Sequence, residues 1–367
     1  LEGSPAPQEI ILTNPIVRLI RRVDGTLLFG LDPDKESALG LQETVENRSG
    51  LEESANALLH LVVRALSDPG DSSNLPGYLD GVSIRNAAIV FSDQRSGLEW
   101  LVPSGRIELF RDQEGVRLES KLPYFNSGES SEILLNGIYA QGEETLSLSL
   151  AFNNLRPSSF ARLLPSIPYM EGMDIDVSGL LHVDLSLSNA SLTLKTAQLE
   201  IEQGQGVVSL PEPIMRKIPL EQINLVMNAQ DSLSGISIGS FSAKLLNKSK
   251  TGPIMRLSLN GSRLLVAPNV SMQISIDSLT LNELTTYWPE KVKPNTRTWI
   301  KRNLRKGDIT NVTFDVVLGG QSVQDLDVVS FSGEAHLNGF EVTYIKNMPP
   351  IENVSGVMSL GLSEVVI

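Results

Sequence analysis

Apolar and polar residues alternate along most of this chain. The alternation is regular at residues 146–152, 181–187 and 272–276, where every second side chain is leucine, isoleucine, valine, methionine or phenylalanine. Successive side chains of a β-strand point to opposite faces, so each run predicts a strand with one apolar face and one polar face. The pattern therefore predicts a mainly β protein.

Runs of this kind are bounded by turn residues and follow one another at a spacing of about ten residues, which is typical of an all-β chain. They extend from residue 82 to the end, and residues 9–31 add further short strands. Two hairpin turns are predicted, one at Asp24 and Gly25 and one between Asp112 and Gly115. In total the sequence predicts roughly fifteen to twenty strands.

Apolar residues recur at the spacing of a helix in only a few segments. The longest is an amphipathic helix at residues 51–67, which ends before Pro69. A helical turn is expected at residues 157–164, and two short helices at residues 282–288 and 295–304. This is too little helix to cover the apolar side of so many strands.

The apolar strand faces must therefore be shielded in another way. If about forty inward side chains each gain roughly 1.5 to 3 kcal/mol on burial, an open wet face is excluded. Three arrangements remain: stacked sandwiches, a closed barrel, or a sheet curled into a trough that an apolar guest fills. Aromatic residues make up 5% of the chain, which argues against the aromatic girdles of a membrane barrel. Tandem sandwiches and an elongated curled sheet both remain open.

Composition and net charge exclude several classes of function. The 367 residues carry a formal net charge of −13, and 41% of them are hydrophobic. An acidic chain is a poor partner for nucleic acid, because phosphates require a basic surface. The chain has no cysteine, which excludes thiol catalysis, cysteine-bound zinc and disulfides.

No catalytic or metal-binding constellation is visible in the sequence. The histidines His60, His182 and His336 are isolated, and each is expected at the surface. Asp174 and Asp176 are close in sequence, but they fall in a predicted turn, where solvated acids are usual. Paired histidines at metal spacing, a nucleophile elbow and a phosphate-binding loop are missing. We therefore expect a protein that is not an enzyme and uses no cofactor or metal.

Both ends of the chain are interpreted as cut points in a longer protein. Residues 1–8 contain two prolines and a glycine and are expected to be a linker or expression scar. Residues 9–80 are expected to hold the first strands and the amphipathic helix. Residues 81–367 are expected to form one elongated β segment, truncated where the alternation is still running.

Residues 287–311 carry a recognisable signature. They read Tyr-Trp-Pro-Glu-Lys-Val-Lys-Pro-Asn-Thr-Arg-Thr-Trp-Ile-Lys-Arg-Asn-Leu-Arg-Lys-Gly-Asp-Ile-Thr-Asn. This resembles the Tyr-Trp-Pro, Pro, Arg, Trp-Ile, Asn and Gly-x-Ile/Val signature of YhdP-type proteins in the AsmA-like superfamily. Shorter matches at residues 155–165, 177–179 and 344–356 extend the resemblance over most of the chain from residue 84 onward.

The resemblance implies a large envelope protein of Gram-negative bacteria, held in the inner membrane by an N-terminal helix. Its periplasmic part would be a long, twisted antiparallel sheet that curls into a hydrophobic groove, with a few short helices. Such proteins are proposed to carry phospholipid between the inner and outer membranes, so the expected partners are phospholipid, both membranes and other envelope proteins. The alternative is a structural or adhesive β-rich envelope protein with a dry core.

An apolar trough suits a lipid. A tail of about sixteen carbons gains on the order of 13 kcal/mol on leaving water, whereas its transfer from bilayer to trough costs little. The trough needs a continuous aliphatic lining and no catalytic group. The residues predicted to line it are Leu148, Leu150, Leu185, Leu187, Leu257, Leu259, Ile274, Ile276, Phe314, Val316, Phe331 and Leu337.

A basic cluster lies within the signature stretch of this acidic chain. It comprises Lys291, Lys293, Arg297, Lys301, Arg302, Arg305 and Lys306. Four of these cations are predicted to contact lipid head groups or an acidic partner: Arg297, Lys301, Arg302 and Arg305. Trp288 and Trp299 are expected to be buried at the groove edge. The alternative is a solvated helix face whose tryptophans plug the sheet.

Overall fold

The computed structural model describes most of the chain after residue 78 and two short stretches before it. The described residues are 8–23, 27–32, 79–94, 97–113, 115–126, 129–140, 145–161, 170–188, 191–210, 216–231, 233–246, 252–288, 294–323, 325–345, 347–362 and 365–366. The predicted helix at residues 51–67, with His60, lies outside them. So do the turn at Asp24 and Gly25 and the cations Lys291 and Lys293.

Within these residues the chain is mainly β, which confirms the fold class predicted from the alternation. The strands are β1 (Glu9–Thr13), β2 (Ile16–Arg21), β3 (Leu27–Asp32), β4 (Gly81–Asp93), β5 (Leu98–Asp112), β6 (Gly115–Asn126), β7 (Glu129–Ala140), β8 (Thr145–Leu155), β9 (Met173–Ser188), β10 (Ser191–Leu210), β11 (Arg216–Gln230), β12 (Gly235–Leu245), β13 (Ile254–Ser262), β14 (Asn269–Thr280), β15 (Leu304–Arg305), β16 (Asp308–Gly320), β17 (Leu326–Val342), β18 (Ile351–Gly361) and β19 (Val365–Val366). The helices are α3 (Leu281–Tyr287) and α4 (Pro294–Asn303), and 3-10 turns occur at Pro157–Phe160 and Met170–Gly172.

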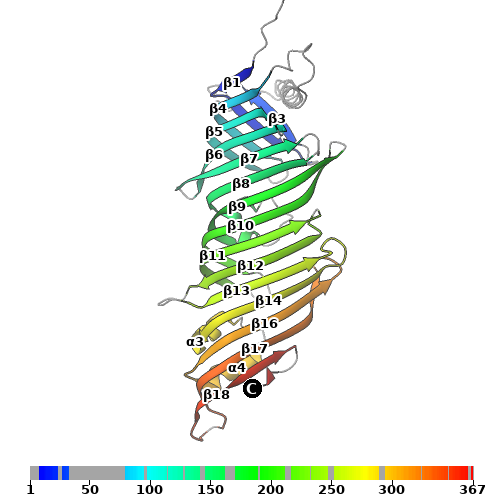
Figure 1. Ribbon diagram of the computed structural model, residues 1–367. Coiled ribbons are helices and arrows are strands. Elements are labelled where there is room, and N and C mark those ends of the chain that lie inside the picture. The colour runs from blue at the N-terminus through cyan, green and yellow to red at the C-terminus, as the bar shows by residue number, and fades with distance from the viewer. Residues whose placement is uncertain are drawn as a thin grey trace, which may run out of the picture. The chain divides into compact units, whose positions relative to one another are not determined.

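These strands belong to one mixed sheet (Figure 1). Most neighbours pair antiparallel, and Asp112 lies opposite Gly115 at the predicted hairpin between β5 and β6. A purely antiparallel sheet is nevertheless wrong at the first edge, where β1 and β2 both run parallel to β4. A parallel pair needs a long connection between its strands, and β2 and β4 are separated in the sequence by residues 22–80, which include β3.

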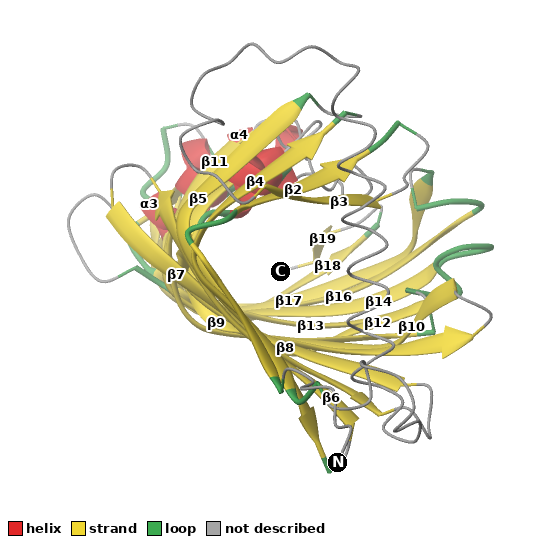
Figure 2. Ribbon diagram, turned by 90° about the horizontal axis from the view of Figure 1, so that it is seen from above, coloured by secondary structure: helices red, strands yellow, loops and turns green. Residues whose placement is uncertain are grey.

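The chain divides into two compact units. The first comprises Leu1–Leu155, Phe160–Ser166 and Leu180–Thr193, and the second comprises Arg156–Ser159, Ile167–Gly179 and Leu194–Ile367. Within each unit the sheet is curled and does not close on itself (Figure 2). The first unit carries β1 to β8, and the second carries β11 to β18 with both helices.

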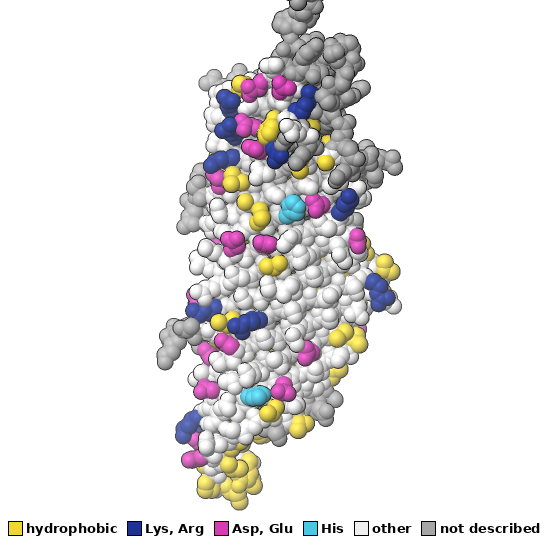
Figure 3. All heavy atoms as spheres, in the orientation of Figure 1, with side chains coloured by type: hydrophobic (Ala, Val, Ile, Leu, Met, Phe, Trp, Pro, Cys, Tyr) yellow, Lys and Arg dark blue, Asp and Glu magenta, His cyan; other side chains and the backbone are white. Residues whose placement is uncertain are grey.

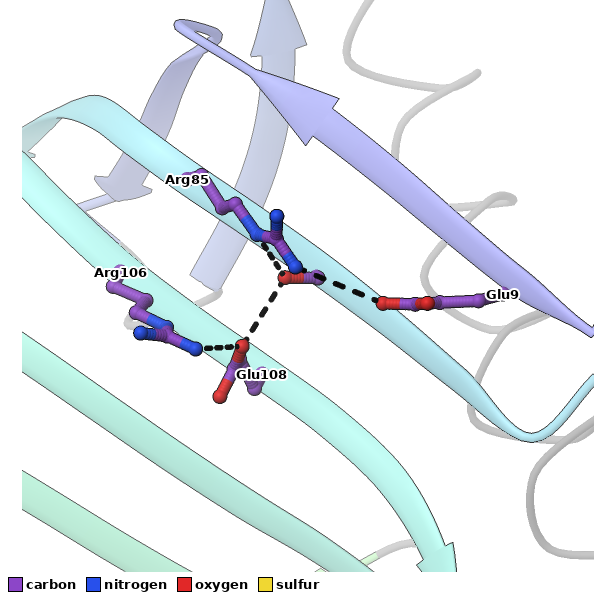
Figure 4. Close-up of polar contacts among 5 residues, drawn as sticks. Glu9, Arg85, Arg106 and Glu108 are labelled. Carbon is purple, nitrogen blue, oxygen red and sulfur yellow. Dashed lines mark hydrogen bonds and ion pairs between the residues drawn. The ribbon is translucent and has the colours of Figure 1, made fainter.

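The first unit combines a small apolar core with charged pairs. Val17, Ala87 and Val116 are among the buried side chains of the core formed by β2, β4 and β6. On β4 and β5, the Arg85 guanidinium donates to Ser83 Oγ at 3.1 Å, and Ser83 donates to Glu108 at 3.3 Å (Figure 4).

The same network extends to the flanking charges. Arg106 lies 2.6 Å from Glu108, and Arg85 lies 4.0 Å from Glu9 on β1 (Figure 4). The hydrogen bond from Arg106 holds the pKa of Glu108 below its ordinary value. These contacts join β1, β4 and β5 through side chains as well as through the backbone ladder.

In the second unit, a helical excursion separates β14 from β16 in the sequence, while these two strands pair directly with each other. The excursion forms α3 and α4 and ends at β15. Thr280 caps α3, because its hydroxyl accepts from the Glu283 N–H and the Glu283 side chain accepts from the Thr280 N–H. The short strand β15 then pairs with β17, with Leu304 opposite Val342.

Candidate apolar ligand-binding face

Strand register in the second unit lines up apolar side chains across seven neighbouring strands. Residues directly opposite each other in an antiparallel pair point to the same face of the sheet. What we call the first row comprises Ile201, Leu225, Phe241, Leu257, Ile274, Phe314 and Gly333. What we call the second row comprises Leu199, Met227, Ile238, Leu259, Met272, Val316 and Phe331.

The opposite face of the same strands is polar. Between the two apolar rows and their neighbours run polar positions such as Gln198, Asn228, Ser237, Asn260 and Ser271, which also lie opposite one another. Figure 3 shows the polar side of these strands, with few hydrophobic side chains among charged and other polar ones. The two faces predicted from the alternation are therefore present.

Every residue of the two apolar rows is half-buried, and none is fully buried. A dry core looks different: in the cluster under the helices, Ile309 is 1% exposed and Phe340 is 0% exposed. The rows therefore contain a continuous band of aliphatic and aromatic side chains that the described residues leave partly uncovered. This band, in β10 to β14, β16 and β17, is the candidate binding face.

The helices cover the apolar face beside this band. Ile300 on α4 is 3% exposed and packs with Leu279 and Leu337 from β14 and β17. Arg297 fixes α4 to α3, because its guanidinium donates to the carbonyl oxygens of Thr285 at 2.9 Å and Trp288 at 3.2 Å. In Figure 2 the helices lie on the side toward which the strands bend. The apolar face is thus sealed beneath the helices and half-open along the two rows.

The structure brings six of the predicted groove residues together in the two rows. These are Leu257, Leu259, Ile274, Phe314, Val316 and Phe331. Ile276 is half-buried at the border with the helices, where it packs against the dry cluster. Leu337 is on the predicted face but does not line an open groove, because it is 4% exposed beneath the helical excursion. The predicted lining was wrong for this residue.

The remaining predicted groove residues belong to the first unit. Leu148 and Leu150 on β8 lie opposite Gly137 and Leu135, and both are half-buried. Leu185 on β9 is also half-buried, while the side chain of Leu187 lies outside what the structure describes. Serines on the other phase of β8 face the polar side.

Contacts with two serines of β8 show on which face of β9 His182 lies. Ser149 Oγ lies 2.9 Å from His182 Nδ1, and Ser147 donates to Asp184 at 2.6 Å. His182 therefore lies on the polar side of β9, as predicted. His336 lies 3.3 Å from Glu334 on β17. Each of the two histidines has a side chain that is 43% exposed.

The acids Asp174 and Asp176 are placed differently from the prediction. The predicted turn contains the 3-10 turn Met170–Gly172, but β9 already begins at Met173, so both side chains lie on one face of a strand. Arg156 binds both oxygens of Asp176 at 2.8 Å and lies 3.4 Å from Asp174. Asp176 is therefore an ion-pair partner rather than a solvated acid. Among the described residues, no group of three or more acids and histidines is arranged to hold a metal.

The cations of the basic cluster have different surroundings in the structure. Arg297 is engaged within the helical excursion, whereas the side chains of Lys301, Arg302 and Arg305 are exposed. Lys306 lies 2.7 Å from Glu341, and this hydrogen bond raises the Lys306 pKa. Trp288 packs against the dry cluster but is half-buried instead of buried. Trp299, on α4, is 43% exposed.

Several members of the rows were not identified from the sequence. They are Leu199, Ile201, Leu225, Met227, Ile238, Phe241 and Met272. Most of them stand in the apolar phase of a predicted strand, so the alternation contains the necessary signal. Ile238 and Phe241 are an exception, because an irregularity in the pairing of β12 with β13 separates them by three positions.

Two further findings bear on identity. No helix among the described residues is both long enough and apolar enough to cross a membrane. No protein-family model, curated protein or solved structure matches this chain.

Proposed function

We propose that the apolar face of the second unit binds lipid acyl chains, and that the protein carries phospholipid through the periplasm between two membranes. The observation that supports this most directly is the pair of half-buried rows across seven strands. A lipid carrier needs an aliphatic lining that is continuous and not already filled by the protein. The two rows are continuous across seven strands, and the described residues leave them partly uncovered.

The energetics favour such an occupant. Each methylene group removed from water contributes about 0.8 kcal/mol, so an acyl chain is held strongly by an apolar face. Movement from one strand to the next exchanges one leucine, isoleucine or phenylalanine surface for another. A chain bound along the rows would therefore meet apolar side chains on each described strand, because the polar side chains of these strands point to the other face.

Head groups would stay in water at the edge of the apolar face. The exposed cations Lys301, Arg302 and Arg305 lie on or next to α4, which borders the rows. Their charges suit a lipid phosphate, because ammonium and guanidinium groups form charge-assisted hydrogen bonds with phosphate oxygens. Arg297 contributes indirectly, since it holds α4 against α3.

The resemblance of residues 287–311 to YhdP-type proteins supports the same proposal. The described residues of that stretch belong to the end of α3, to α4, to β15 and to the start of β16, which is the part of the unit that borders the rows. The alternative function is a structural or adhesive envelope protein. It would require the two rows to be covered by protein instead of lipid.

The first test is gentle isolation of the protein followed by native mass spectrometry. We expect phospholipid to remain bound to the wild-type chain. Leu259→Lys places a charge in the second row, whereas Ser258→Lys places the same charge on the opposite, exposed face of β13. The first variant should lose phospholipid and the second should retain it.

Thermal unfolding of both variants controls for misfolding. Leu259 is half-buried, so a lysine at this position can extend its amine to water and the fold should survive. Absence of lipid from the wild-type protein, together with no uptake of a fluorescent phospholipid, would contradict the proposal. Equal retention of lipid by the two variants would show that lipid binds elsewhere.

A further inference from the structure

A close approach of an aromatic ring to a glycine occurs in the first row. Phe314 on β16 lies opposite Gly333 on β17, at the position where every other strand contributes a large side chain. A Cβ atom added to Gly333 would lie 2.7 Å from Cδ1 and 3.0 Å from Cε1 of the Phe314 ring. The ring therefore covers Gly333 and occupies the place that a side chain would otherwise fill.

Contacts on both sides hold the ring in this position. Phe314 stacks on Phe331 of the second row, with ring centroids 5.8 Å apart and an interplanar angle of 25°. It also packs against the dry cluster beneath the helices. The two rings and Gly333 thus form a low aromatic floor where the sealed and half-open parts of the face meet.

We infer that Gly333 sets the depth of the binding face, and thereby selects two-chain lipids over single-chain ones. This inference rests on the proposed function. Any larger side chain at position 333 must lift the Phe314 ring, because the Thr313 carbonyl oxygen, 3.2 Å from the added Cβ, restricts movement of the strand itself. A lifted ring rises into the space above the rows and leaves less room for acyl chains side by side.

The test compares Gly333→Ala with Gly239→Ala. Gly239 lies in β12, and a Cβ added there meets no atom within 4 Å, so the control adds the same methyl group without a clash. The probes are oleate, with one chain, and phosphatidylglycerol, with two, each titrated into the delipidated 367-residue chain. Gly333→Ala should weaken phosphatidylglycerol binding about tenfold and oleate binding much less, the size of effect that overpacking produces. Gly239→Ala should change neither.

A second substitution tests the cause. Phe314→Leu combined with Gly333→Ala removes the ring that the new methyl group displaces, so phosphatidylglycerol binding should recover. Should Gly333→Ala fail to fold by circular dichroism, Phe314→Leu alone is decisive, because it deepens the floor and should raise phosphatidylglycerol binding relative to oleate.

The outcomes separate the inference from the function. Three results would each overturn the inference while lipid binding stands. The first is equal affinity of Gly333→Ala and wild type for both lipids, and the second is an equal loss of affinity in both glycine variants. The third is an unchanged ratio of phosphatidylglycerol affinity to oleate affinity in Phe314→Leu. If the wild-type chain binds neither probe, the proposed function and the inference fail together.

Discussion

Asp93, at the end of β4, carries a carboxylate whose side chain has no exposed surface. It lies opposite Arg21 in the parallel pair of β2 and β4. Arg21 Nε donates to one carboxylate oxygen at 3.0 Å, and Nη2 donates to the other. The hydrogen bond that Arg21 donates to Asp93 raises the pKa of the Arg21 guanidinium above its ordinary value. The parallel edge of the sheet thus includes a buried ion pair.

Substitution of Arg21 tests the importance of this pair. Arg21→Met leaves the buried Asp93 carboxylate without its bidentate partner, and we expect a loss of about 3 kcal/mol in the free energy of unfolding. Urea denaturation measures the loss. Arg18→Met, on the same strand, is the matched control and should change stability by less than about 0.5 kcal/mol. Similar losses in both variants would mean that the effect belongs to the strand and not to the pair.

Glu108 predicts a pH dependence of stability in the first unit. Its pKa is lowered in the folded state, chiefly by the hydrogen bond from Arg106. The folded protein therefore gains stability at pH values above the ordinary pKa of 4.5, and loses it as the pH falls through the lower folded value. Because Arg106 is 57% exposed, we expect only about 0.5 kcal/mol.

The measurement is the free energy of unfolding as a function of pH for wild type and Arg106→Gln. The two curves should differ at neutral pH and converge in acid. A constant difference at all pH values would assign the contribution of Arg106 to packing of its methylene groups.

At the scale of elements, α4 presents two neighbouring apolar residues with different roles. Ile300 is 3% exposed in the dry cluster, whereas Trp299 is 43% exposed. Removal of buried methylene groups leaves a cavity, so Ile300→Ala should cost about 3 kcal/mol. Trp299→Ala should cost less than about 1 kcal/mol, since most of its effect falls on a solvated surface. A larger cost for Trp299 in thermal unfolding would show that its ring is part of the core.

The alternation predicted the elements well, because a strand with one wet face needs polar residues at every second position. The alternation and its glycines predict separate strands at residues 192–202 and 206–210, and again at residues 328–337 and 340–345. In the structure the first two form the single strand β10, and the break predicted before Phe340 lies inside β17. In each case a glycine resembles a turn signal, but the backbone ladder continues past it.

The candidate site was less accessible to prediction, because it depends on register between strands. Leu337 and Phe331 share one phase of β17, yet one is covered by α4 and β15 and the other is half-open. Periodicity identifies the face of a residue but not its position relative to a helix that packs from elsewhere in the sequence. The contact of Phe314 with Gly333 likewise has no counterpart in either strand alone.

For the molecule as a whole, the half-open rows predict how it responds to an apolar ligand. Folded, lipid-free protein should bind the dye anilinonaphthalene sulfonate, because this dye binds to exposed apolar surface. Most folded soluble proteins leave little contiguous apolar surface exposed, so the signal would be distinctive. Added phosphatidylglycerol should displace the dye and raise the thermal midpoint; saturation to about 100 times the dissociation constant adds about 2.7 kcal/mol of stability. Leu259→Lys should reduce both responses, and Ser258→Lys should reduce neither. Folded wild-type protein that binds no dye would favour the dry-core alternative, since the rows would then be closed to a ligand in solution.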